Sequence, residues 1–590
     1  MECDHLSLVL GLLLCCVYAN GLGIYKLGKE LIVNGNMEYD NWDSQYQWYS
    51  PKATVTQVPG VVGNAAAILE KNQKSVQFAQ RLFDDRALES GGYYYMEGYV
   101  KLLNHPGDEE WYTMNMKFRY TGEDSVQTFL VIGSYPRLRD TDGWVKIAGE
   151  FRVPVNSTGH IVNVYSVDGP NLQFAVDEVS LKQIIPDDDW EAAANEMIDE
   201  YRKGEVNVNV NITYNLDPSY VTFKIKQLSH DFQLGAYVWS STINGSTDTA
   251  LIRERYQNYV YDNFNSAATS RGFRWKFVEK DEGVLNFETV DKAVYSLTER
   301  GVNIVGGEVF WDSTYYGWPA WVNDKTPTET VQLMEKRVND VVGYFNDRVN
   351  TWIVSRDNLQ NGVFLSKTGD YKIVDKMFDW MEAATNGANL ILTNINVLRL
   401  STFTSALVNQ AKTLKDSGHT IQIGAMGIFD SIYTIDPIEL MARLDILAQA
   451  EVPIVITNLI VQRTDVMERA QDLEKVLRVI FAHPNVERII MDGFWDGRLL
   501  REHSSLVDTD KFVINKAGWT LSRLFKKEWR SDGILTLPEK YLAQQTASFR
   551  AFYGDYEMDV MVDDAIVETR KFSVHKGIPT NIDVDINKSE

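Results

Sequence analysis

The chain has 590 residues, of which 44% are hydrophobic and 24% charged, the composition of a folded globular protein. Its 81 acidic and 58 basic residues give a formal net charge of −23, which argues against nucleic acid as a partner. We interpret this charge as solubility in extracellular fluid, with binding of cations or mineral as the alternative. The length exceeds that of one ordinary core and predicts several domains.

The first 21 residues have the pattern of a secretory signal peptide. The segment 6–19, LSLVLGLLLCCVYA, is a short apolar run followed by small residues, and an uncleaved anchor or a misread start of the chain are the alternatives. All three cysteines lie inside it, so the secreted, mature protein is expected to have no disulfide and no thiolate metal site. No later run is long and apolar enough to cross a membrane, so no membrane contact is expected after cleavage. Four N-x-S/T triplets mark candidate N-glycosylation sites at Asn156, Asn211, Asn244 and Asn587.

Residues 31–185 consist of short aromatic and β-branched segments separated by Gly, Asn and Asp, a pattern that predicts a jelly-roll-like β-sandwich. Residues 186–230 are expected to form a linker helix and a short β segment that leads into the next domain. After residue 530 the alternating pattern returns, so residues 531–590 are predicted to be a small C-terminal β module packed on the barrel.

Residues 231–530 alternate between apolar β-type runs and helical segments. The eight runs are 232–239, 264–269, 302–310, 349–355, 388–394, 419–428, 452–458 and 486–493. Helix signals separate them, including a capping box with proline at Thr326-Pro327-Thr328-Glu329, a second helix start at Asp436-Pro437, and a helix stop at Gly418. Eight strands, each followed by a helix, predict a (β/α)₈ TIM barrel, with a doubly wound open sheet as the alternative.

In such a barrel the reacting groups lie at the carboxyl ends of the strands. The fourth run ends in WIVSRDN (352–358) and the seventh in ITNL (456–459). Both resemble segments of the family-10 glycoside hydrolases, the endo-β-1,4-xylanases, where they read W-D-V-V-N-E and T-E-L-D. The resemblance extends over most of the chain. It implies a TIM barrel, hydrolysis of O-glycosyl bonds, a polysaccharide as partner, and no cofactor.

The two catalytic positions depart from the family pattern. By resemblance, Asp357 stands at the acid/base glutamate and Asn458 at the nucleophilic glutamate. A retaining glycosidase needs two carboxyl groups about 5–5.5 Å apart, one to protonate the leaving oxygen and one to attack the sugar. An asparagine amide cannot attack, and aspartate is one methylene shorter than glutamate. The catalytic motifs are therefore degenerate.

The positions that surround the catalytic pair in the family also differ here. The resemblance places Ser270, Arg271 and Gly272 at a Glu-Asn-Glu that binds sugar hydroxyls, Arg274 at a lysine, Gly307, Asp312 and Ile428 at histidines, and Asp492 at a tryptophan. Each exchange removes a group that would hold a xylose ring. The whole catalytic face has changed along with the two glutamates.

Aromatic side chains are the other candidates for sugar contact, because flat rings pack on pyranose C–H groups. In the barrel these candidates are Trp275, Trp311 and Trp318. The N-terminal sandwich is similar to the carbohydrate-binding modules often attached to these enzymes, and there the cluster around Trp42, Trp48 and Tyr49 is predicted to form a ligand face, with core packing as the alternative.

Metal chemistry has little support, because the eight histidines show no paired ligand spacing. We interpret Asp177 and Glu178 as turn acids, with ligands of a structural calcium ion, as in similar modules, as the alternative.

Three functions follow from the sequence. The first is a secreted carbohydrate-binding pseudoenzyme that has kept the xylanase-like barrel and lost hydrolysis. The second is an active endo-β-1,4-xylanase or related glycanase that uses Asp357 with another acid at the cleft; the candidates are Glu308, Asp312, Asp492 and Asp496. The third is a structural protein of an acidic extracellular matrix.

Overall fold

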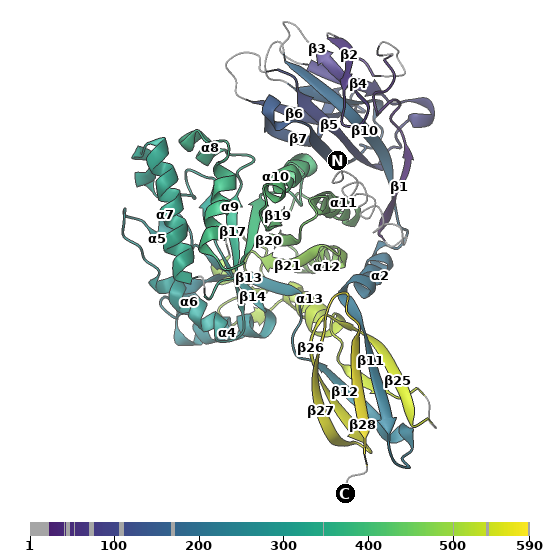
Figure 1. The fold of residues 1–590 in the computed structure, drawn as a ribbon, viewed down its shortest axis with the longest axis vertical. Helices are drawn as coiled ribbons and strands as arrows, with labels where there is room; N and C mark the ends of the chain where they lie inside the picture. Colours follow the sequence, from purple (N-terminus) through teal and green to yellow (C-terminus); the bar gives the residue numbers. More distant parts are fainter. Residues whose placement is uncertain are drawn as a thin grey trace, which may run out of the picture.

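The computed structural model describes residues 23–587 except 41, 43–47, 52, 70–75, 105–110, 167–171, 346, 500 and 539–541. The expected signal segment, residues 1–21, lies outside the described residues. Three bodies follow one another along the long axis of the molecule: an N-terminal β-sandwich, a central α/β barrel and a second β-sandwich beside the C-terminus (Figure 1). Within the described part of the chain, no helix is long and apolar enough to cross a membrane.

Eight parallel strands close into a ring, which confirms the predicted TIM barrel. The sheet runs β15-β14-β13-β21-β20-β19-β18-β17, and the pairing of β15 with β17 closes it. The strands are β13 (Gln233–Trp239), β14 (Ser266–Ser270), β15 (Asn303–Gly306) with its continuation β16 (Phe310–Trp311), β17 (Thr351–Arg356), β18 (Asn389–Asn394), β19 (Ile421–Phe429), β20 (Ile454–Val461) and β21 (Val486–Met491). Each predicted run therefore overlaps one strand of the barrel, and β14, β17, β19 and β20 extend past the ends of their runs.

Helices surround the ring and bury one apolar side against it. They are α3 (Ser240–Ile243), α4 (Ala250–Asn263), α5 (Trp275–Val278), α6 (Glu288–Thr298), α7 (Pro327–Phe345), α8 (Val363–Thr368), α9 (Ile373–Ala384), α10 (Thr404–Asp416), α11 (Pro437–Ala448), α12 (Val466–Ala482) and α13 (Lys516–Arg523). The capping box before α7 forms as expected, because the Thr326 N–H donates to Glu329 at 2.7 Å and the Glu329 N–H donates to the Thr326 hydroxyl at 3.3 Å. Asp436 caps α11 in the same way, accepting from the N–H of Ile438 at 2.9 Å.

The interior of the barrel is filled by a layer of apolar side chains. Seven strands contribute one residue each: Tyr237, Ala268, Val305, Ile353, Ile391, Val455 and Ile490, all at most 6% exposed. This layer closes the barrel below its mouth, so a ligand can reach only the carboxyl ends of the strands and the loops that follow them. We call this layer the barrel floor.

The N-terminal sandwich has two antiparallel sheets, with the strand orders β2-β3-β10-β5-β8 and β4-β9-β6-β7, and β1 pairs with β10. The strands are β1 (Tyr25–Glu30), β2 (Thr54–Pro59), β3 (Asn64–Leu69), β4 (Val76–Arg81), β5 (Tyr93–Leu102), β6 (Tyr112–Thr121), β7 (Gln127–Leu138), β8 (Val145–Arg152), β9 (Thr158–Ser166) and β10 (Gln173–Pro186). Strict alternation in β5, where every second residue is buried, explains why the sequence pattern revealed this fold.

The second sandwich is assembled from both sides of the barrel in the sequence. Its strands are β11 (Lys203–Ile212), β12 (Val221–Gln227), β24 (Gly533–Thr536), β25 (Gln544–Phe552), β26 (Gly554–Val562), β27 (Ala565–Val574) and β28 (Thr580–Ile586). The sheet orders are β25-β11-β28 and β24-β12-β26-β27, so the short β segment before the barrel supplies a central strand to each sheet. On the outer face, Asn207, Asn209 and Asn211 of β11 donate to Asn581, Asp583 and Asp585 of β28.

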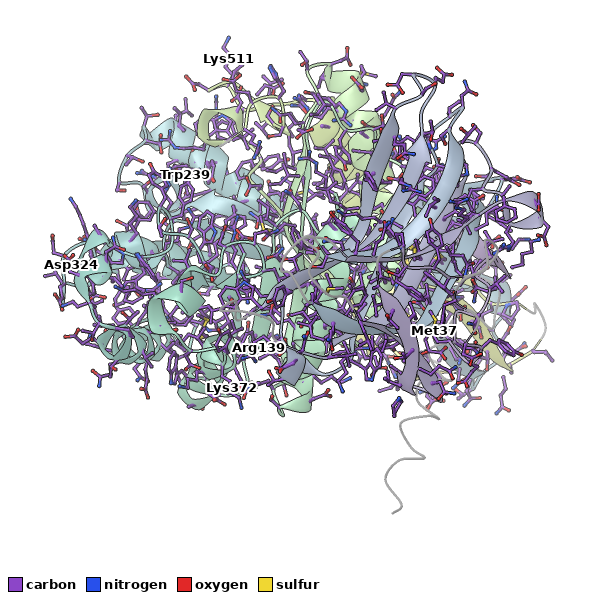
Figure 2. The ribbon with its side chains drawn as sticks, turned by 90° about the horizontal axis from the view of Figure 1, so that it is seen from above. Met37, Arg139, Trp239, Asp324, Lys372 and Lys511 are labelled. Carbon is purple, nitrogen blue, oxygen red and sulfur yellow. The ribbon has the colours of Figure 1, made fainter. Side chains whose placement is uncertain are left out.

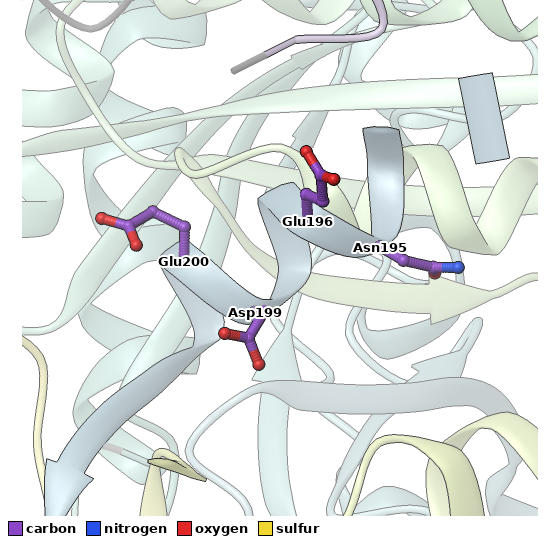
Figure 3. Close-up of a pocket in the computed structure, with 4 residues that line it drawn as sticks. All are labelled: Asn195, Glu196, Asp199 and Glu200. Atoms are coloured by element: carbon purple, nitrogen blue, oxygen red, sulfur yellow. The ribbon is translucent and has the colours of Figure 1, made fainter. Parts of the chain in front are cut away.

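The predicted linker helix is α2 (Trp190–Arg202), which the Asp189 side chain caps by accepting from the Ala192 N–H. Its buried side holds Ala194, Met197 and Ile198 in the same core as the barrel. Its outer side carries Glu196, Asp199 and Glu200, which line a shallow acidic pocket (Figure 3). The helix therefore belongs to the packed structure.

Candidate functional site

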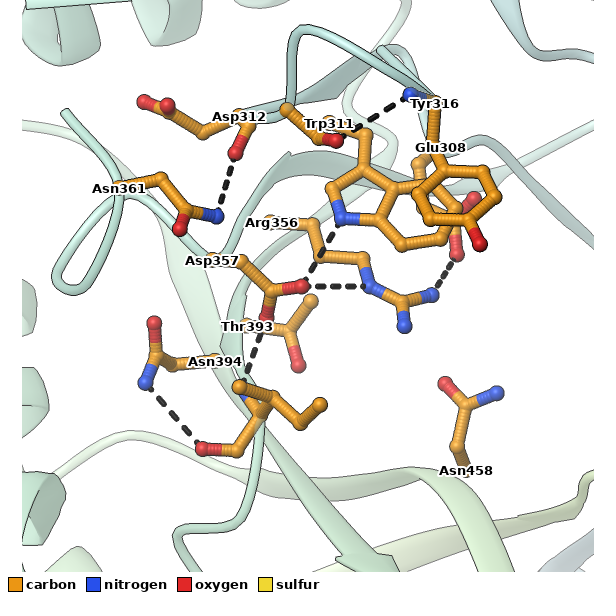
Figure 4. Close-up of polar contacts among 12 residues, drawn as sticks. Glu308, Trp311, Asp312, Tyr316, Arg356, Asp357, Asn361, Thr393, Asn394 and Asn458 are labelled. Atoms are coloured by element: carbon orange, nitrogen blue, oxygen red, sulfur yellow. Dashed lines mark hydrogen bonds and ion pairs between the residues drawn. The ribbon is translucent and has the colours of Figure 1, made fainter. Parts of the chain in front are cut away.

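The two predicted catalytic positions lie at the mouth of the barrel and are both buried. Asp357 follows the last residue of β17, and Asn458 lies within β20 (Figure 4). They are 4% and 5% exposed, respectively. The strand ends therefore bring both residues to the catalytic face, as the sequence indicated, but without exposing either side chain to solvent.

The carboxylate of Asp357 is fully engaged by N–H groups of the protein. Oδ1 accepts from the backbone N–H of Ile395 at 2.8 Å. Oδ2 accepts from the indole Nε1 of Trp311 at 2.9 Å and from Nε of Arg356 at 3.2 Å. The backbone of Asp357 is left-handed, with φ 63°, and its N–H donates to the Thr393 carbonyl at 3.1 Å. Neither oxygen of Asp357 is left without a protein donor.

A buried ion cluster lies beside Asp357. Glu308, 1% exposed, accepts from Nε of Arg274 at 2.7 Å and from Nη1 of Arg356. Burial by itself would raise the pKa of Glu308, but the guanidinium groups of Arg274 and Arg356 outweigh it and hold the pKa at about 2. The indole of Trp311 packs against both guanidinium groups, with 4.0 Å between its ring centre and Cζ of Arg356 and 4.5 Å to Cζ of Arg274. We call Glu308, Arg274 and Arg356 the mouth cluster.

On the opposite side of the mouth, Asn458 donates from Nδ2 to Oδ1 of Asp492 at 2.6 Å. Burial raises the pKa of Asp492 above its ordinary value. The amide of Asn458 thus neither attacks nor exchanges a proton, and it occupies one oxygen of the nearest acid. Protein groups thus donate hydrogen bonds to the carboxylates of Glu308, Asp492 and Asp357.

The remaining candidate acids also have structural contacts. Asp312 is 2% exposed and accepts from the backbone N–H of Val363, and burial raises its pKa to about 7. Asp496 accepts from the N–H of Thr509 at 2.9 Å. Both therefore hold loops at the mouth.

The structure corrects part of the predicted aromatic site. Trp275 and Trp318 are only 1% and 3% exposed. The indole N–H of Trp275 donates to Glu279 at 2.8 Å, and the Trp318 ring packs edge-on against Phe364. They are core residues, because their rings fill the space between the βα loops and the helices. Trp311 is partly exposed and stacks on Tyr316 with 4.7 Å between ring centres.

The N-terminal aromatic cluster also differs from the prediction. Trp48 is fully buried and stacks on Phe78 at 4.7 Å, and Trp42, 8% exposed, packs edge-on against the same ring at 5.8 Å. Both indoles are buried in the core of the sandwich, so neither can present a flat face to a sugar. Tyr49 is partly exposed beside Arg81 and remains a prediction.

The acids at the end of the N-terminal module are turn anchors in this structure. Asp177 is fully buried and accepts from the backbone N–H groups of Val61 at 2.7 Å and Glu178 at 2.8 Å. Among the described residues, no group of three or more Asp, Glu, His or Cys side chains is arranged to hold a metal ion. Of the four sequons, Asn156 and Asn587 are exposed, while Asn211 and Asn244 are partly buried.

The N-terminal sandwich is docked on the barrel by contacts that no local sequence pattern indicated. Arg137 of β7 donates from Nη2 to the carbonyl of Leu359 at 3.0 Å and to that of Asn358, in the loop directly after Asp357. Glu150 of β8 accepts from Nε of Arg443 on α11 at 2.7 Å, and both side chains are buried. Figures 1 and 2 show the sandwich lying against the α10 and α11 side of the barrel. The sandwich thus contacts a loop of the catalytic face.

Comparison with known proteins shows which family the barrel matches. Residues 226–511 match the family model described as glycosyl hydrolase family 10. Among curated proteins, the chain is 28% identical over 377 residues to the anti-sigma-I factor RsgI6 of Acetivibrio thermocellus, covering 63% of this chain and 47% of that protein. It is 26% identical over 474 residues to endo-1,4-beta-xylanase 3 of Arabidopsis thaliana, covering 78% of this chain and 60% of the relative. The chain thus spans about half the length of these relatives.

Solved structures in the same comparison are more distant in sequence. Native xylanase 10B of Thermotoga maritima aligns with a TM-score of 0.45 at 18% identity, over 50% of this chain and 96% of the xylanase. The xylanase 10B of Clostridium thermocellum, with CBM22-1 and GH10 modules and xylohexaose bound, aligns with a TM-score of 0.44 at 13% identity, over 85% of this chain and 97% of that one.

Proposed function

Because residues 226–511 form a glycosyl hydrolase family 10 domain, we propose that the protein binds a polysaccharide at the mouth of this barrel without hydrolysing it. The observation that carries the proposal is the state of the two catalytic positions. Position 357 holds a carboxylate whose two oxygens accept three N–H groups of the protein, and position 458 holds an amide.

Each step of a retaining mechanism lacks its group. The acid must turn a free oxygen toward the glycosidic bond. In Asp357, however, one oxygen accepts a hydrogen bond from Ile395 and the other accepts from Trp311 and Arg356. The nucleophile must be a carboxylate on the other side of the sugar ring, and Asn458 supplies an amide that already donates to Asp492. Loss of one catalytic group costs orders of magnitude in rate, and here neither group is available.

A second candidate is a hydrolase that uses Asp492. Its burial and its raised pKa are properties of a general acid, which favours this alternative. Asp492 lacks a free nucleophilic partner, however, because Glu308 is held between two arginines. The binding function therefore has the stronger support.

The test uses the purified full-length chain. We expect no release of reducing sugar from xylan or other β-glucans above the blank, together with retardation of the protein in gels that contain a soluble polysaccharide. Turnover that is abolished by Asp357→Ala or by Asp492→Ala contradicts the proposal and supports the hydrolase. The rates of these two variants also identify the acid that is used.

We include secretion in the proposal. Support comes from the signal-like residues 1–21 and from the exposure of Asn156 and Asn587 within their sequons. Expression of the full-length chain in a eukaryotic secretory host is expected to deliver it to the medium with a mass that falls after glycosidase treatment. Retention of the whole protein inside the cells contradicts this part.

A further inference from the structure

The mouth of the barrel carries exposed and partly exposed aromatic rings interleaved with basic side chains. The group, which we call the cation–aromatic rim, comprises Trp239, Arg271, Lys276, Phe277, Tyr315 and Tyr316. Trp239 is the last residue of β13, Arg271 follows β14, Lys276 and Phe277 lie on α5, and the two tyrosines lie in the loop after β16. All six thus belong to the carboxyl ends of the first three barrel strands, where barrels of this type bind their ligands.

Arg271 is the centre of one half of the rim. Its Cζ lies 5.2 Å from the ring centre of Trp239 and 5.5 Å from that of Phe277. The residue has a left-handed backbone with φ 66°, a conformation that is costly for any residue with a Cβ and that accumulates at binding sites. The strained turn after β14 therefore holds an exposed guanidinium group between two aromatic rings.

Lys276 has the same role in the other half. Its Nζ lies 4.3 Å from the ring centre of Tyr315 and donates to the carbonyl of that residue at 2.6 Å. Tyr315 packs edge-on against Tyr316 at 4.6 Å, and Tyr316 stacks on Trp311, whose indole borders the mouth cluster (Figure 4). The rim thus continues inward to the buried arginines.

Three aromatic side chains of the rim are exposed to solvent, although burial of their apolar surface would be favourable. Tyr315 is 67% exposed, Tyr316 46% and Phe277 44%. Exposed rings at the mouth of the barrel offer flat faces to the C–H groups of sugar rings. They are located where the buried Trp275 and Trp318 were expected to contact a ligand.

The electrostatics of the rim run against the charge of the whole protein. The net charge is −23, yet within the described residues Arg271 and Lys276 have no carboxylate partner. Deeper in the mouth, Arg274 and Arg356 share Glu308, and Arg356 also pairs with Asp357, so the buried charges there balance. The positive charge that Arg271 and Lys276 present at the mouth therefore has no carboxylate partner in the described part of the chain and attracts an anionic ligand.

We propose that the cation–aromatic rim makes this barrel a receptor for an anionic polysaccharide, one whose sugar rings bear carboxylate or sulfate groups. Aromatic faces pack on the sugar rings, while Arg271 and Lys276 pair with the acid groups in charge-assisted hydrogen bonds. A neutral chain would displace water from both cations without returning a charge partner, and therefore binds less tightly. This inference rests on the proposed binding function and names its ligand class.

The first experiment compares matched polymers that differ only in charge. The full-length protein is titrated by calorimetry with polygalacturonate and its methyl-esterified form, with dextran sulfate and dextran, and with unsubstituted xylan. We expect each anionic polymer to bind about tenfold more tightly than its neutral match, corresponding to about 1.4 kcal/mol. The preference should shrink as salt rises above about 0.15 M, because the rim cations are exposed. Polygalacturonate against dextran sulfate separates carboxylate from sulfate recognition.

The second experiment assigns the preference to the rim. Arg271→Gln combined with Lys276→Gln is expected to lower affinity for the anionic polymer about tenfold more than it lowers affinity for neutral xylan. The matched control is Lys224→Gln with Lys226→Gln, which removes the same charge from exposed positions on β12 of the second sandwich. The control should bind as the parent does, and an unchanged melting temperature shows that both variants are folded.

The outcomes separate this inference from the proposed function. Equal affinity for charged and neutral polymers, or equal losses in the rim variant and its control, overturns the anionic ligand while polysaccharide binding stands. Equally tight binding of a single-stranded oligonucleotide also overturns it, because the site would then recognise anions in general. Measured hydrolysis overturns the proposed function. The inference about the ligand would stand even then, provided that the preference for the anionic polymer disappears in the rim variant, because the anionic polymer would be the substrate.

Discussion

The barrel floor and the barrel mouth are both built on the strands of the barrel, but in opposite ways. The floor is an apolar layer in which Ile353, Ile391 and Val455 are at most 2% exposed. At the carboxyl ends of the strands, the mouth is an ion cluster around Glu308, and Asp357 and Asn458 beside it form hydrogen bonds with other residues of the protein. The floor maintains the fold through packing alone, so the mouth could exchange its chemistry without loss of the barrel.

The largest effect is expected from breaking the mouth cluster. Glu308→Gln leaves Arg274 and Arg356 buried with less compensating charge, which should cost about 3–5 kcal/mol of unfolding free energy at pH 7. Urea titration of the variant and the parent measures it. A loss below about 1 kcal/mol would mean that the cluster contributes no more than a surface ion pair.

The same pair of proteins tests the direction of the pH dependence. The folded pKa of Glu308, about 2, lies below its ordinary value of 4.5. Its stabilising contribution is therefore complete above pH 4.5 and is lost as the pH falls toward 2. The difference in stability between parent and variant should shrink over that range, and a difference that stays constant contradicts the assignment.

A change in the barrel floor should cost somewhat less and should not depend on pH. Ile391→Ala removes buried methyl groups from a fully buried position and is expected to cost about 3 kcal/mol. Because no charge is involved, the loss should be the same at pH 4 and pH 7 in urea titrations. If instead the loss varies with pH, floor and mouth are energetically coupled and the contrast between them fails.

These two layers also show how much the sequence could predict. The floor and the eight strands were predictable because near-continuous apolar runs such as 452–458 are local patterns, and β20 lies at that place. The positions of Asp357 and Asn458 followed from motifs at the ends of the strands.

The contacts around those positions could not be predicted. Glu308 and Arg356 meet across 48 residues of sequence and Arg137 reaches Asn358 across 221, so only the folded barrel joins them. The indoles of Trp42 and Trp48 were ambiguous for a related reason, because an aromatic residue in a β-sandwich suits its core or a ligand face equally. The rim residue Arg271 was visible in the sequence as a departure from the family pattern, but its exposure between two rings was not.

A smaller loss of stability is expected from removing the contact between the N-terminal sandwich and the loop after Asp357. Arg137→Ala leaves the carbonyls of Asn358 and Leu359 without their donor and should cost about 1–3 kcal/mol. Hydrogen exchange should show that Arg137→Ala speeds the opening of the loop after Asp357 more than the opening of the barrel floor. Arg119→Ala on β6 of the same sandwich is the control, and equal exchange in the two variants would mean that Arg137 does not hold the loop.

The smallest effect, none above the blank, is expected from restoring the two glutamates. In Asp357→Glu with Asn458→Glu, the new carboxyl at position 357 still faces the indole N–H of Trp311 and the guanidinium of Arg356, and Arg356 still belongs to the mouth cluster. A carboxyl group at position 458 would lie beside the buried Asp492, and two adjacent carboxylates resist joint ionisation. Release of reducing sugar from xylan measures the outcome. Turnover in this double variant would show that the two catalytic residues alone had been lost, whereas its absence places the barrier in the mouth cluster and in Asp492, which the two substitutions leave as they are.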